Sequence, residues 1–574
     1  MRNIIRNSVI FVFISLLLIL SLKAALSDFG KAKNLNNLGL ADVEIYGVIA
    51  GDQSGYSIAG DGDFDGDGTP DVLIGAPLSD SRIHGVDSGK TYLFSGCTIR
   101  DLGDTIDLSM ADHVFFGENV GDQSGYAVAF LKDIDGDTKD EIIIGAPYNE
   151  DEVMYGSGEW RACGKTYIVF STSLVNTNIN LSSADRNIVG QSSTLSHGNA
   201  FSGRAVAGTG DVDGDGLGDL LIGSYSYNGP VGSYHIGNAY VLLGSTLLNS
   251  SNNLNLPDHY DYRILGTFSG SNPNAGKSLA FAGDVDGDGK DDFLIAAPGH
   301  IGGGTSWGGV GLFLSTSLTT SPNELLPDYK FTTKLEYPLI YDLFGESVAG
   351  AGDVDGDGLS DIIIGEPLND EGGTDAGKVY IFLASTILSS SEQIINALDA
   401  DYALTGAGAN DQLGCSVAGG LLIDDDNSSD ILIGAKNGSL LGSDRGMVYV
   451  VLGKSLQSGV VNDVASYFLL GEYDGDLAGH SIASAGDING DGLDDVIVSA
   501  PGNDDNGPES GKVYIVITGL SLEPCESDIS GKKPSKKGDK LDLEKKDFNE
   551  RDGPVKYIYK GCPDPPVDPG KRKS

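Results

Sequence analysis

Short runs of aliphatic residues recur along the chain, and several of them end in glycine and proline. Examples are Asp71–Pro77 (DVLIGAP), Glu141–Pro147 (EIIIGAP) and Asp361–Pro367 (DIIIGEP). Runs of this length that close on Gly and Pro are typical of buried β-strands and are too short for helices. The hydrophobic pattern therefore predicts an all-β fold.

Each aliphatic run belongs to a unit with four strand-like pieces. In the first unit, a segment with Ile45 and Tyr46 ends at Gly47, and a strand of small residues covers Gly55–Ala59. The aliphatic run follows, and Gly89–Phe94 (GKTYLF) comes last. Four antiparallel strands per unit, repeated along the chain, predict a β-propeller, whose sheet edges are short and protected.

An acidic nonapeptide, D-x-D-G-D-G-x-x-D, precedes the aliphatic run of each unit. Its copies start 70, 78, 73, 69, 69 and 65 residues apart, at Asp63, Asp133, Asp211, Asp284, Asp353, Leu422 and Asp487. Self-similarity at a fixed period of this size is typical of repeat architectures. We therefore predict a seven-bladed β-propeller with calcium-binding loops over residues 40–520.

A linking strand separates neighbouring units, as in Leu108–Gly117, Leu398–Gly406 and Val464–Gly471. No such segment follows the seventh unit, but Leu40–Gly47 precedes the first. We therefore predict that this N-terminal strand completes the last blade and closes the ring without a covalent link.

The nonapeptide has the composition of a calcium loop. Ca²⁺ takes six to eight oxygen ligands at about 2.3–2.6 Å, and carboxylates at positions 1, 3, 5 and 9 with a carbonyl near position 7 supply such a set. Glycines at positions 4 and 6, Gly66 and Gly68 in the first loop, allow the tight turns. An EF-hand is excluded because position 12 is aliphatic, as in Ile74, and a strand follows instead of a helix.

The alternative is an acidic turn that binds no metal. Repeated copies with three or four carboxylates in nine residues argue against it, because unneutralised like charges repel at that separation. The loop that ends at Glu141 has a longer acid and no glycine at position 6. The loop that begins at Leu422 lacks the first ligand, so we expect weak calcium binding or none there.

The order F-G, acidic nonapeptide, I-G-A-P and G-K-x-Y resembles the FG-GAP repeat of integrin α-subunit propellers and covers about Leu40 to Leu520. The resemblance implies calcium loops on the lower face of the disc and protein partners on the upper face. It also implies side-chain ligands at positions 1, 3, 5 and 9 and a backbone oxygen at position 7. In this sequence these are Asp63, Asp65, Asp67, Thr69 and Asp71; Asp133, Asp135, Asp137, Lys139 and Glu141; Asp211, Asp213, Asp215, Leu217 and Asp219; Asp284, Asp286, Asp288, Lys290 and Asp292; Asp353, Asp355, Asp357, Leu359 and Asp361; and Asp487, Asn489, Asp491, Leu493 and Asp495.

The sequence also departs from the integrin pattern. It has no inserted domain between the second and third units, Gly223–Tyr225 replaces G-A-P in the third, and the aromatic–Gly segment near Tyr337 is blurred. Integrin α-subunits continue into further extracellular domains and a transmembrane helix, neither of which we expect in this protein. We therefore expect a free-standing secreted propeller, for which activity as a heterodimeric receptor is not implied.

The N-terminus predicts export. Arg2 and Arg6 precede an apolar run, Val9–Leu22, and small residues follow it, so residues 1–25 are read as a signal peptide. An uncleaved anchor is the alternative, although the run is short for a transmembrane helix. The net charge of −45 argues against nucleic acid as a partner, because phosphate binding needs a basic surface.

The five cysteines do not form a disulfide-built scaffold. Cys415 lies in a predicted core strand and reads as a buried thiol, and Cys97 and Cys163 can pair only if neighbouring units bring them together. Cys525 and Cys562 bracket a segment of the C-terminal tail and are candidates for a pair.

The tail, residues 521–574, is rich in lysine, acids and proline. Such a composition is typical of a polar, largely disordered extension. A small appendage clasped by a cysteine pair is the alternative.

A binding function is favoured over catalysis. The seven histidines are scattered, no motif pairs one with a nucleophile, and His480 lies in a small-residue strand near the predicted axis. We therefore predict a secreted, calcium-binding adhesion module for an extracellular or cell-surface protein or glycan, and not an enzyme. The alternatives are an extracellular hydrolase or lyase that uses the propeller channel, and a purely structural surface-layer component.

Overall fold

The computed structural model describes residues 35–37, 41–150, 162–173, 177–190, 200–225, 237–256, 258–266, 274–298, 308–318, 325–333, 342–438 and 444–519. These residues belong to the first of two compact units, Met1–Cys525 and Glu526–Ser574. The predicted signal peptide, the tail with Cys525 and Cys562, and Tyr337 lie outside the described residues.

Antiparallel pairing groups the described strands in fours, seven groups in all, which we number as blades 1 to 7 in chain order. A single parallel residue pair, Gly208 with Leu131, joins blades 2 and 3 into one sheet. In blade 1, the acidic loop joins the first strand to the aliphatic second strand, and every strand pairs with the next. Its strands are β3 (Ser57–Gly62), β4 (Asp71–Ala76), β5 (Lys90–Phe94) and β7 (His113–Phe116).

The other blades repeat this order. Their strands are β8 (Ala127–Leu131), β9 (Glu141–Ala146), β10 (Lys165–Val169) and β12 (Arg186–Val189); β13 (Ser202–Gly210), β14 (Asp219–Ser224), β15 (Asn238–Leu242) and β17 (Tyr262–Leu265); β18 (Ser278–Gly283), β19 (Asp292–Ala297), β20 (Gly309–Phe313) and β21 (Tyr329–Thr332); β22 (Ser347–Gly352), β23 (Asp361–Glu366), β24 (Lys378–Phe382) and β26 (Tyr402–Thr405); β27 (Leu413–Leu421), β28 (Asp430–Ala435), β29 (Met447–Val451) and β31 (Tyr467–Leu470); and β32 (Ile482–Gly486), β33 (Asp495–Ala500), β34 (Lys512–Val516) and β2 (Val43–Tyr46).

The blades are arranged in a closed ring. The first strand of each blade contacts the first strand of the next, from β3 through β8, β13, β18, β22 and β27 to β32, and β32 contacts β3 again. Apolar side chains fill every interface between neighbouring blades. The predicted all-β propeller is therefore confirmed.

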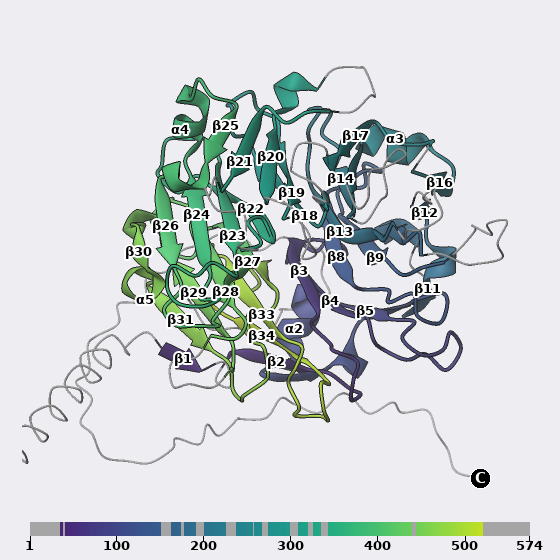
Figure 1. The fold of residues 1–574 in the computed structure, drawn as a ribbon. Coiled ribbons are helices and arrows are strands. Elements are labelled where there is room, and N and C mark those ends of the chain that lie inside the picture. The colour runs from purple at the N-terminus through teal and green to yellow at the C-terminus, as the bar shows by residue number, and fades with distance from the viewer. Residues whose placement is uncertain are drawn as a thin grey trace, which may run out of the picture. The chain divides into compact units, whose positions relative to one another are not determined.

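The N-terminal strand completes the last blade, as the sequence predicts. β2 pairs antiparallel with β34, from Val43 opposite Ile515 to Tyr46 opposite Lys512, although the two strands lie near opposite ends of the described chain (Figure 1). Val43 and Ile45 are buried in the cluster that joins blades 7 and 1. Closure thus combines a strand ladder with apolar packing.

A further strand, β1 (Leu35–Asn37), precedes the predicted closing segment and pairs in parallel with β31 of blade 6. The same parallel pairing recurs around the ring, where a short strand ahead of one blade's outer strand pairs with the outer strand of the preceding blade. These strands are β6 (Thr105–Asp107), β11 (Asn178–Asn180), β16 (Asn253–Asn255), β25 (Ile394–Asn396) and β30 (Gly459–Val460). Two or three residues are too few to show an alternating pattern, which explains why these strands were not predicted.

Short helical turns connect the third and fourth strands. They are α2 (Gly96–Leu102), η3 (Leu108–Met110), η4 (Ser171–Ser173), η5 (Leu181–Ser183), α3 (Gly244–Asn249), η7 (Ser315–Ser317), α4 (Ala384–Ser389), η8 (Ala397–Asp399), η9 (Gly453–Ser455) and α5 (Val461–Val464). None of the helices in the described part of the chain has the length and apolar character needed to cross a bilayer.

The pairing of Cys97 with Cys163 that the sequence left open is wrong. Cys163 is a buried free thiol, whereas Cys97 is disulfide-bonded. The two residues stand at opposite ends of their blades, because Cys163 precedes β10 and Cys97 follows β5. Cys415 is a free thiol in a strand, β27, as predicted, but its side chain is only partly buried, and its Sγ donates to the carbonyl of Gly479 at 3.6 Å.

Closure can be tested by truncation. Deleting Leu40–Gly47 removes β2 and leaves β34 with an unpaired edge, which favours aggregation. We expect the truncated protein to aggregate or to lose cooperative unfolding, as measured by size-exclusion chromatography and thermal melting. Deleting the tail beyond Ser527 serves as the control and should change neither. A monomeric N-terminal truncation that melts like the parent would show that the ring closes elsewhere.

Candidate metal sites

A buried acid at the ninth position holds each acidic loop in place. In blade 1, Asp71 Oδ2 accepts the backbone N–H of Phe64 at 2.8 Å, and Oδ1 accepts that of Gly96 at 3.0 Å. Asp71 is fully buried. The carboxyl group therefore ties the loop to the start of β4 and to the segment after β5. The same pair of bonds recurs at Asp219, Asp292, Asp361, Asp430 and Asp495.

Burial makes the charged form of these acids costly. Desolvation, with a contribution from the Asp65 carboxylate, raises the pKa of Asp71 to about 8. Burial likewise raises the pKa of Asp292 to about 7 and that of Asp495 to about 7. Without a cation, such carboxyl groups are partly protonated near neutral pH, whereas a bound divalent ion favours the ionised form.

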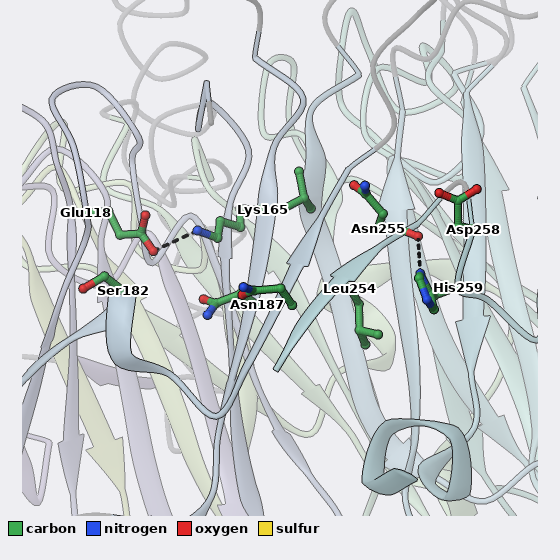
Figure 2. Close-up of a pocket in the computed structure, with 10 residues that line it drawn as sticks. Glu118, Lys165, Ser182, Asn187, Leu254, Asn255, Asp258 and His259 are labelled. Atoms are coloured by element: carbon green, nitrogen blue, oxygen red, sulfur yellow. Dashed lines mark hydrogen bonds and ion pairs between the residues drawn. The ribbon is translucent and has the colours of Figure 1, made fainter. Parts of the chain in front are cut away.

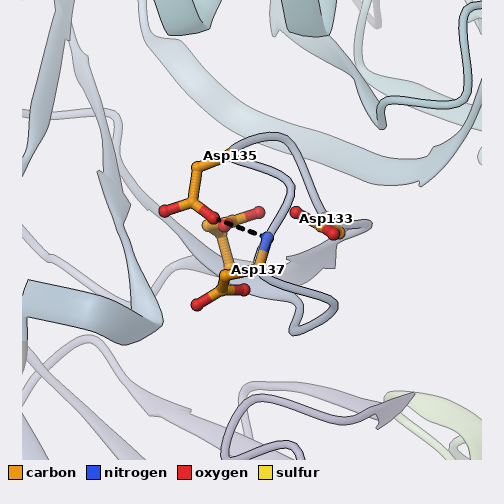
Figure 3. Close-up of side chains that lie close together, drawn as sticks. Asp133, Asp135 and Asp137 are labelled. Carbon is orange, nitrogen blue, oxygen red and sulfur yellow. Dashed lines mark hydrogen bonds between the residues drawn. The ribbon is translucent and has the colours of Figure 1, made fainter.

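Five of the loops bring three or four carboxylates together. In each group the oxygens offered as ligands lie within 4.8 Å of one another, and Figure 3 shows the three aspartates of one group. The groups are Asp63, Asp65 and Asp71; Asp133, Asp135, Asp137 and Glu141; Asp211, Asp213 and Asp219; Asp284, Asp286 and Asp292; and Asp353, Asp355 and Asp357. Most of the predicted acidic ligands of these loops therefore meet in space.

Of the predicted acidic ligands in these five loops, Asp67, Asp215, Asp288 and Asp361 lie outside the groups. No group among the described residues includes the predicted acidic ligands of blade 7, which are Asp487, Asp491 and Asp495. Asp361 uses both carboxylate oxygens for backbone N–H groups, and Asp67 Oδ1 accepts the N–H of Thr69 at 2.7 Å. Coordination of a metal ion by any of the predicted ligands, including the backbone oxygens at position 7, stays a prediction.

The loop of blade 2 gives the clearest test of whether these residues fit a cation. Glu141 Oε2 accepts the N–H of Ile134 at 3.1 Å, but its buried Oε1 has no hydrogen-bond partner among the described residues. Burial raises the pKa of Glu141 to about 9. An orphaned carboxylate oxygen beside three aspartates is the environment that a hard divalent cation stabilises, so the donor set fits calcium.

Hydroxyl groups from the segment after the third strand donate to carboxylates at position 5 of the acidic loops. In blade 2, Ser171 Oγ donates to Asp137 Oδ2 at 3.0 Å. In blade 4, Ser315 Oγ donates to Asp288 Oδ2 at 3.0 Å. The sequence analysis missed both serines, although a Ser-Thr pair after the third strand of both units was a visible signal.

Backbone conformation agrees with the predicted role of the loop glycines. Gly66 and Gly68 adopt φ angles of 76° and 85°, and their N–H groups donate to the two oxygens of Asp63 at 2.8 and 3.0 Å. In blade 2, Thr138 takes the second glycine position at φ 72°, a conformation that costs a β-branched residue energy. The conformation of the blade 2 loop therefore requires backbone strain at Thr138.

The two remaining loops differ in charge. In blade 6, Lys454 Nζ lies 3.5 Å from Asp426 Oδ2. The backbone N–H of Ser428 and, to a lesser degree, this ammonium group lower the pKa of Asp426. Lysine thus supplies positive charge to the loop for which weak calcium binding or none is predicted. In blade 7, the Asn489 side-chain amide donates to Asp491 Oδ2 at 3.1 Å and replaces one acidic ligand.

Backbone bonds join neighbouring loops around the ring. The N–H at position 8 donates to the carbonyl at position 1 of the preceding loop, as from Asp140 to Asp63 at 3.1 Å. Six such bonds connect the loops from blade 1 to blade 7 among the described residues. At the junction of blades 7 and 1 the corresponding residue is Pro70, which has no N–H to donate.

An aromatic cluster lies at the opposite ends of the first strands from these loops, since Tyr56 directly precedes β3 and the acidic loop follows it. Tyr56 donates its hydroxyl hydrogen to Tyr126 at 2.7 Å. The guanidinium of Arg204 lies 4.8 Å from the ring centres of both Tyr126 and Tyr225 and donates to the Tyr126 hydroxyl. Blades 1, 2 and 3 thus contribute to one cation–π arrangement.

We call this group of Tyr56, Tyr126, Arg204 and Tyr225 the axial cluster, and further aromatic side chains extend it on both sides. Phe201 stacks on Tyr225 at 5.5 Å and meets the edge of Tyr148 at 5.1 Å. His480 of blade 7 packs on Tyr56 at 4.8 Å between ring centres. Burial lowers the pKa of His480 to about 4, and its Nδ1 has no hydrogen-bond partner in the part of the chain described. This histidine is thus neutral at physiological pH.

Comparison with known proteins identifies the repeat. The FG-GAP repeat family matches residues 54–94, 124–153, 275–310, 344–382 and 478–516. These stretches contain the acidic loops of blades 1, 2, 4, 5 and 7. The loops that begin at Asp211 and Leu422 lie outside them.

Two kinds of relative are similar to this chain. Phosphatidylinositol-glycan-specific phospholipase D of Homo sapiens is 31% identical over 240 residues, which cover 40% of this chain and 26% of that protein. Integrin alpha-PS2 of Drosophila melanogaster is 31% identical over 206 residues, 33% of this chain and 13% of the integrin. Integrin alpha-5 of Xenopus laevis is 29% identical over 262 residues, 43% of this chain and 22% of the integrin. The chain therefore spans less than a third of each of these relatives.

Metal removal gives the first test of the loops. Each calcium ion that binds the native state alone stabilises it by about 2.7 kcal/mol at a hundredfold excess over Kd. Several sites make the effect large, so we expect EDTA to lower the melting temperature strongly and added calcium to restore it. An unchanged melting temperature in EDTA would contradict the metal assignment.

Single substitutions test the loops one by one. We expect Asp65→Ala, Asp213→Ala and Asp355→Ala each to remove one calcium ion, because each residue belongs to a carboxylate group. Asp424→Ala is the matched control from the loop of blade 6 and should remove none. Elemental analysis of the purified protein should count about five or six ions in the parent, as expected for at most one ion in each loop other than that of blade 6. A count of about two or fewer would contradict the loop-by-loop assignment.

Proposed function

Because this chain belongs to the FG-GAP repeat family of β-propellers, we propose that it is an extracellular, calcium-binding adhesion module. In this proposal the acidic loops bind calcium and stiffen one end of the ring. The opposite end, with the axial aromatic cluster, docks an extracellular or cell-surface partner. Integrin relatives support an adhesion role, and the predicted signal peptide, residues 1–25, supports export.

One observation carries this proposal, namely the axial cluster of partly exposed aromatic side chains around Arg204. Tyrosine, phenylalanine and arginine are enriched at protein interfaces, and tyrosine and arginine are also enriched among binding hot spots. Tyr148, Phe201 and Tyr225 form a continuous edge beside the arginine. A protein surface that presents acidic or apolar side chains matches this chemistry best.

The enzyme alternative has weaker support. Similarity to phosphatidylinositol-glycan-specific phospholipase D covers 26% of the human protein, so its activity is not carried over to this chain. His480, which lies in the axial cluster, contacts the ring of Tyr56. We therefore keep the non-enzymatic role as our proposal.

Capture from cell-surface extracts tests the proposal. We expect the immobilised protein to retain a surface protein or glycoprotein in calcium and to lose it in EDTA, because the loops order the ring. Recovery of the same partner with and without chelator would contradict the proposal that binding of the partner depends on calcium. The absence of any retained partner in calcium would contradict the adhesion role.

Substitutions in the axial cluster locate the binding face. We expect Phe201→Ala and Tyr225→Ala each to weaken capture at least about tenfold, or about 1.4 kcal/mol, with little change in melting temperature. Tyr473→Ala, at a tyrosine that is 58% exposed and outside the cluster, is the matched control and should bind as the parent does. Equal capture by all three variants would place the binding face elsewhere.

A further inference from the structure

A cavity of about 310 Å³ opens on the outer side of blade 2, next to the strand that blade 3 contributes to its edge. Lys165 of β10, Asn187 of β12 and Asn255 of β16 line it, together with Asp258 and His259 (Figure 2). Eight of its ten lining residues have polar side chains. Small-ligand sites start at about 300 Å³, so the cavity can hold one small polar molecule.

One buried side chain that lines the cavity, Asn187, has an oxygen without a hydrogen-bond partner among the described residues. Asn187 is 7% exposed, and this oxygen is Oδ1. A buried acceptor without a partner destabilises the native state. A ligand that donates a hydrogen bond into the cavity would remove this cost.

Comparison with the other blades shows that the fold does not require an amide at this position. Asn187 stands opposite Tyr167 in the strand register. The residues opposite the corresponding tyrosines of blades 1, 5 and 6 are Val114, Ala403 and Phe468. Blades 3, 4 and 7 have the charged residues Arg263, Lys330 and Glu44 there, so the position accepts both apolar and charged side chains. Among the described residues, the buried amide is particular to the blade that has this cavity.

The charges of the cavity favour a neutral ligand. Lys165 Nζ forms an ion pair with Glu118 Oε1 at 2.9 Å, and both side chains are largely buried. Blade 7 has the same pairing between Lys512 and Glu472, so this ion pair belongs to the repeat and leaves little net charge. The remaining polar groups are amides, a hydroxyl, an exposed carboxylate and an imidazole. Such a mixture of donors and acceptors matches the hydroxyl groups of a polyol.

We propose that this cavity binds a sugar residue, with a ligand hydroxyl donating to Asn187 Oδ1. Asp258 and His259 lie at its exposed margin, where their side chains contact further hydroxyls. The proposal rests on the proposed adhesion function only in that glycan is one of the partner classes. The sugar site lies on blades 2 and 3 and is separate from the axial cluster.

The test measures binding of defined sugars to the full chain in calcium. The probes are the methyl glycosides of glucose, galactose, mannose and N-acetylglucosamine, titrated by saturation-transfer NMR. We expect at least one of them to bind the parent and to bind Asn187→Val at least tenfold more weakly. Asp258→Ala should also weaken binding. Lys330→Ala changes the corresponding position of blade 4 and should bind as the parent does.

Melting curves separate binding from folding. Because valine occupies this position in blade 1, we expect Asn187→Val to melt at or above the temperature of the parent while sugar binding is lost. If none of the four glycosides binds the parent, or if Asn187→Val binds equally well, the sugar site is wrong. If sugars fail while calcium-dependent capture persists, only the sugar site falls. If sugar binding is lost in Asn187→Val but nothing is captured from cell-surface extracts, only the adhesion role falls.

Discussion

The carboxyl group that ends each acidic loop is the constraint on which the rest of the structure depends. In blade 1, Asp71 bonds the loop through Phe64 and the start of α2 through Gly96. One buried side chain thereby holds together the loop, the aliphatic strand and the segment after the third strand. Burial disfavours the ionised form of the same group, so the residue that organises the blade also creates the need for a cation. We propose that calcium meets this need at the point where three parts of the blade converge.

Closure of the ring imposes a second constraint at one seam. Between most neighbours, loop-to-loop backbone bonds add to the apolar packing, as from Asp140 to Asp63. Pro70 cannot make this bond, and it instead packs against Gly486, where an added Cβ would lie 2.6 Å from its Cγ. The seam between blades 7 and 1 therefore relies on the pairing of β2 with β34 and on the apolar cluster beneath it. We therefore expect the N-terminal strand to matter more to the ring than its length suggests.

Much of the fold could be predicted because the same strand and loop pattern recurs in each unit of the sequence. The aliphatic runs, the loop glycines and the extra N-terminal strand are recognised by comparing units, and β2 lies where that comparison places it. Features that occur once or are very short could not be predicted in the same way. β1 has three residues, and Ser171 bonds a carboxylate that lies 34 positions earlier. Asn187 resembles any polar residue of a linking strand until the strand register places it opposite Tyr167, where blades 1, 5 and 6 have the apolar residues Val114, Ala403 and Phe468.

The account's central claim is that the acidic loops are calcium sites that hold the ring together, and the position of bound ions tests it most directly. Crystals grown in calcium should give anomalous difference peaks in the loops that begin at Asp63, Asp133, Asp211, Asp284 and Asp353, where carboxylates converge. The loop of blade 6 should give none, because Lys454 already supplies positive charge there. Well-ordered loops without anomalous peaks, or a peak confined to the loop of blade 6, would contradict the account.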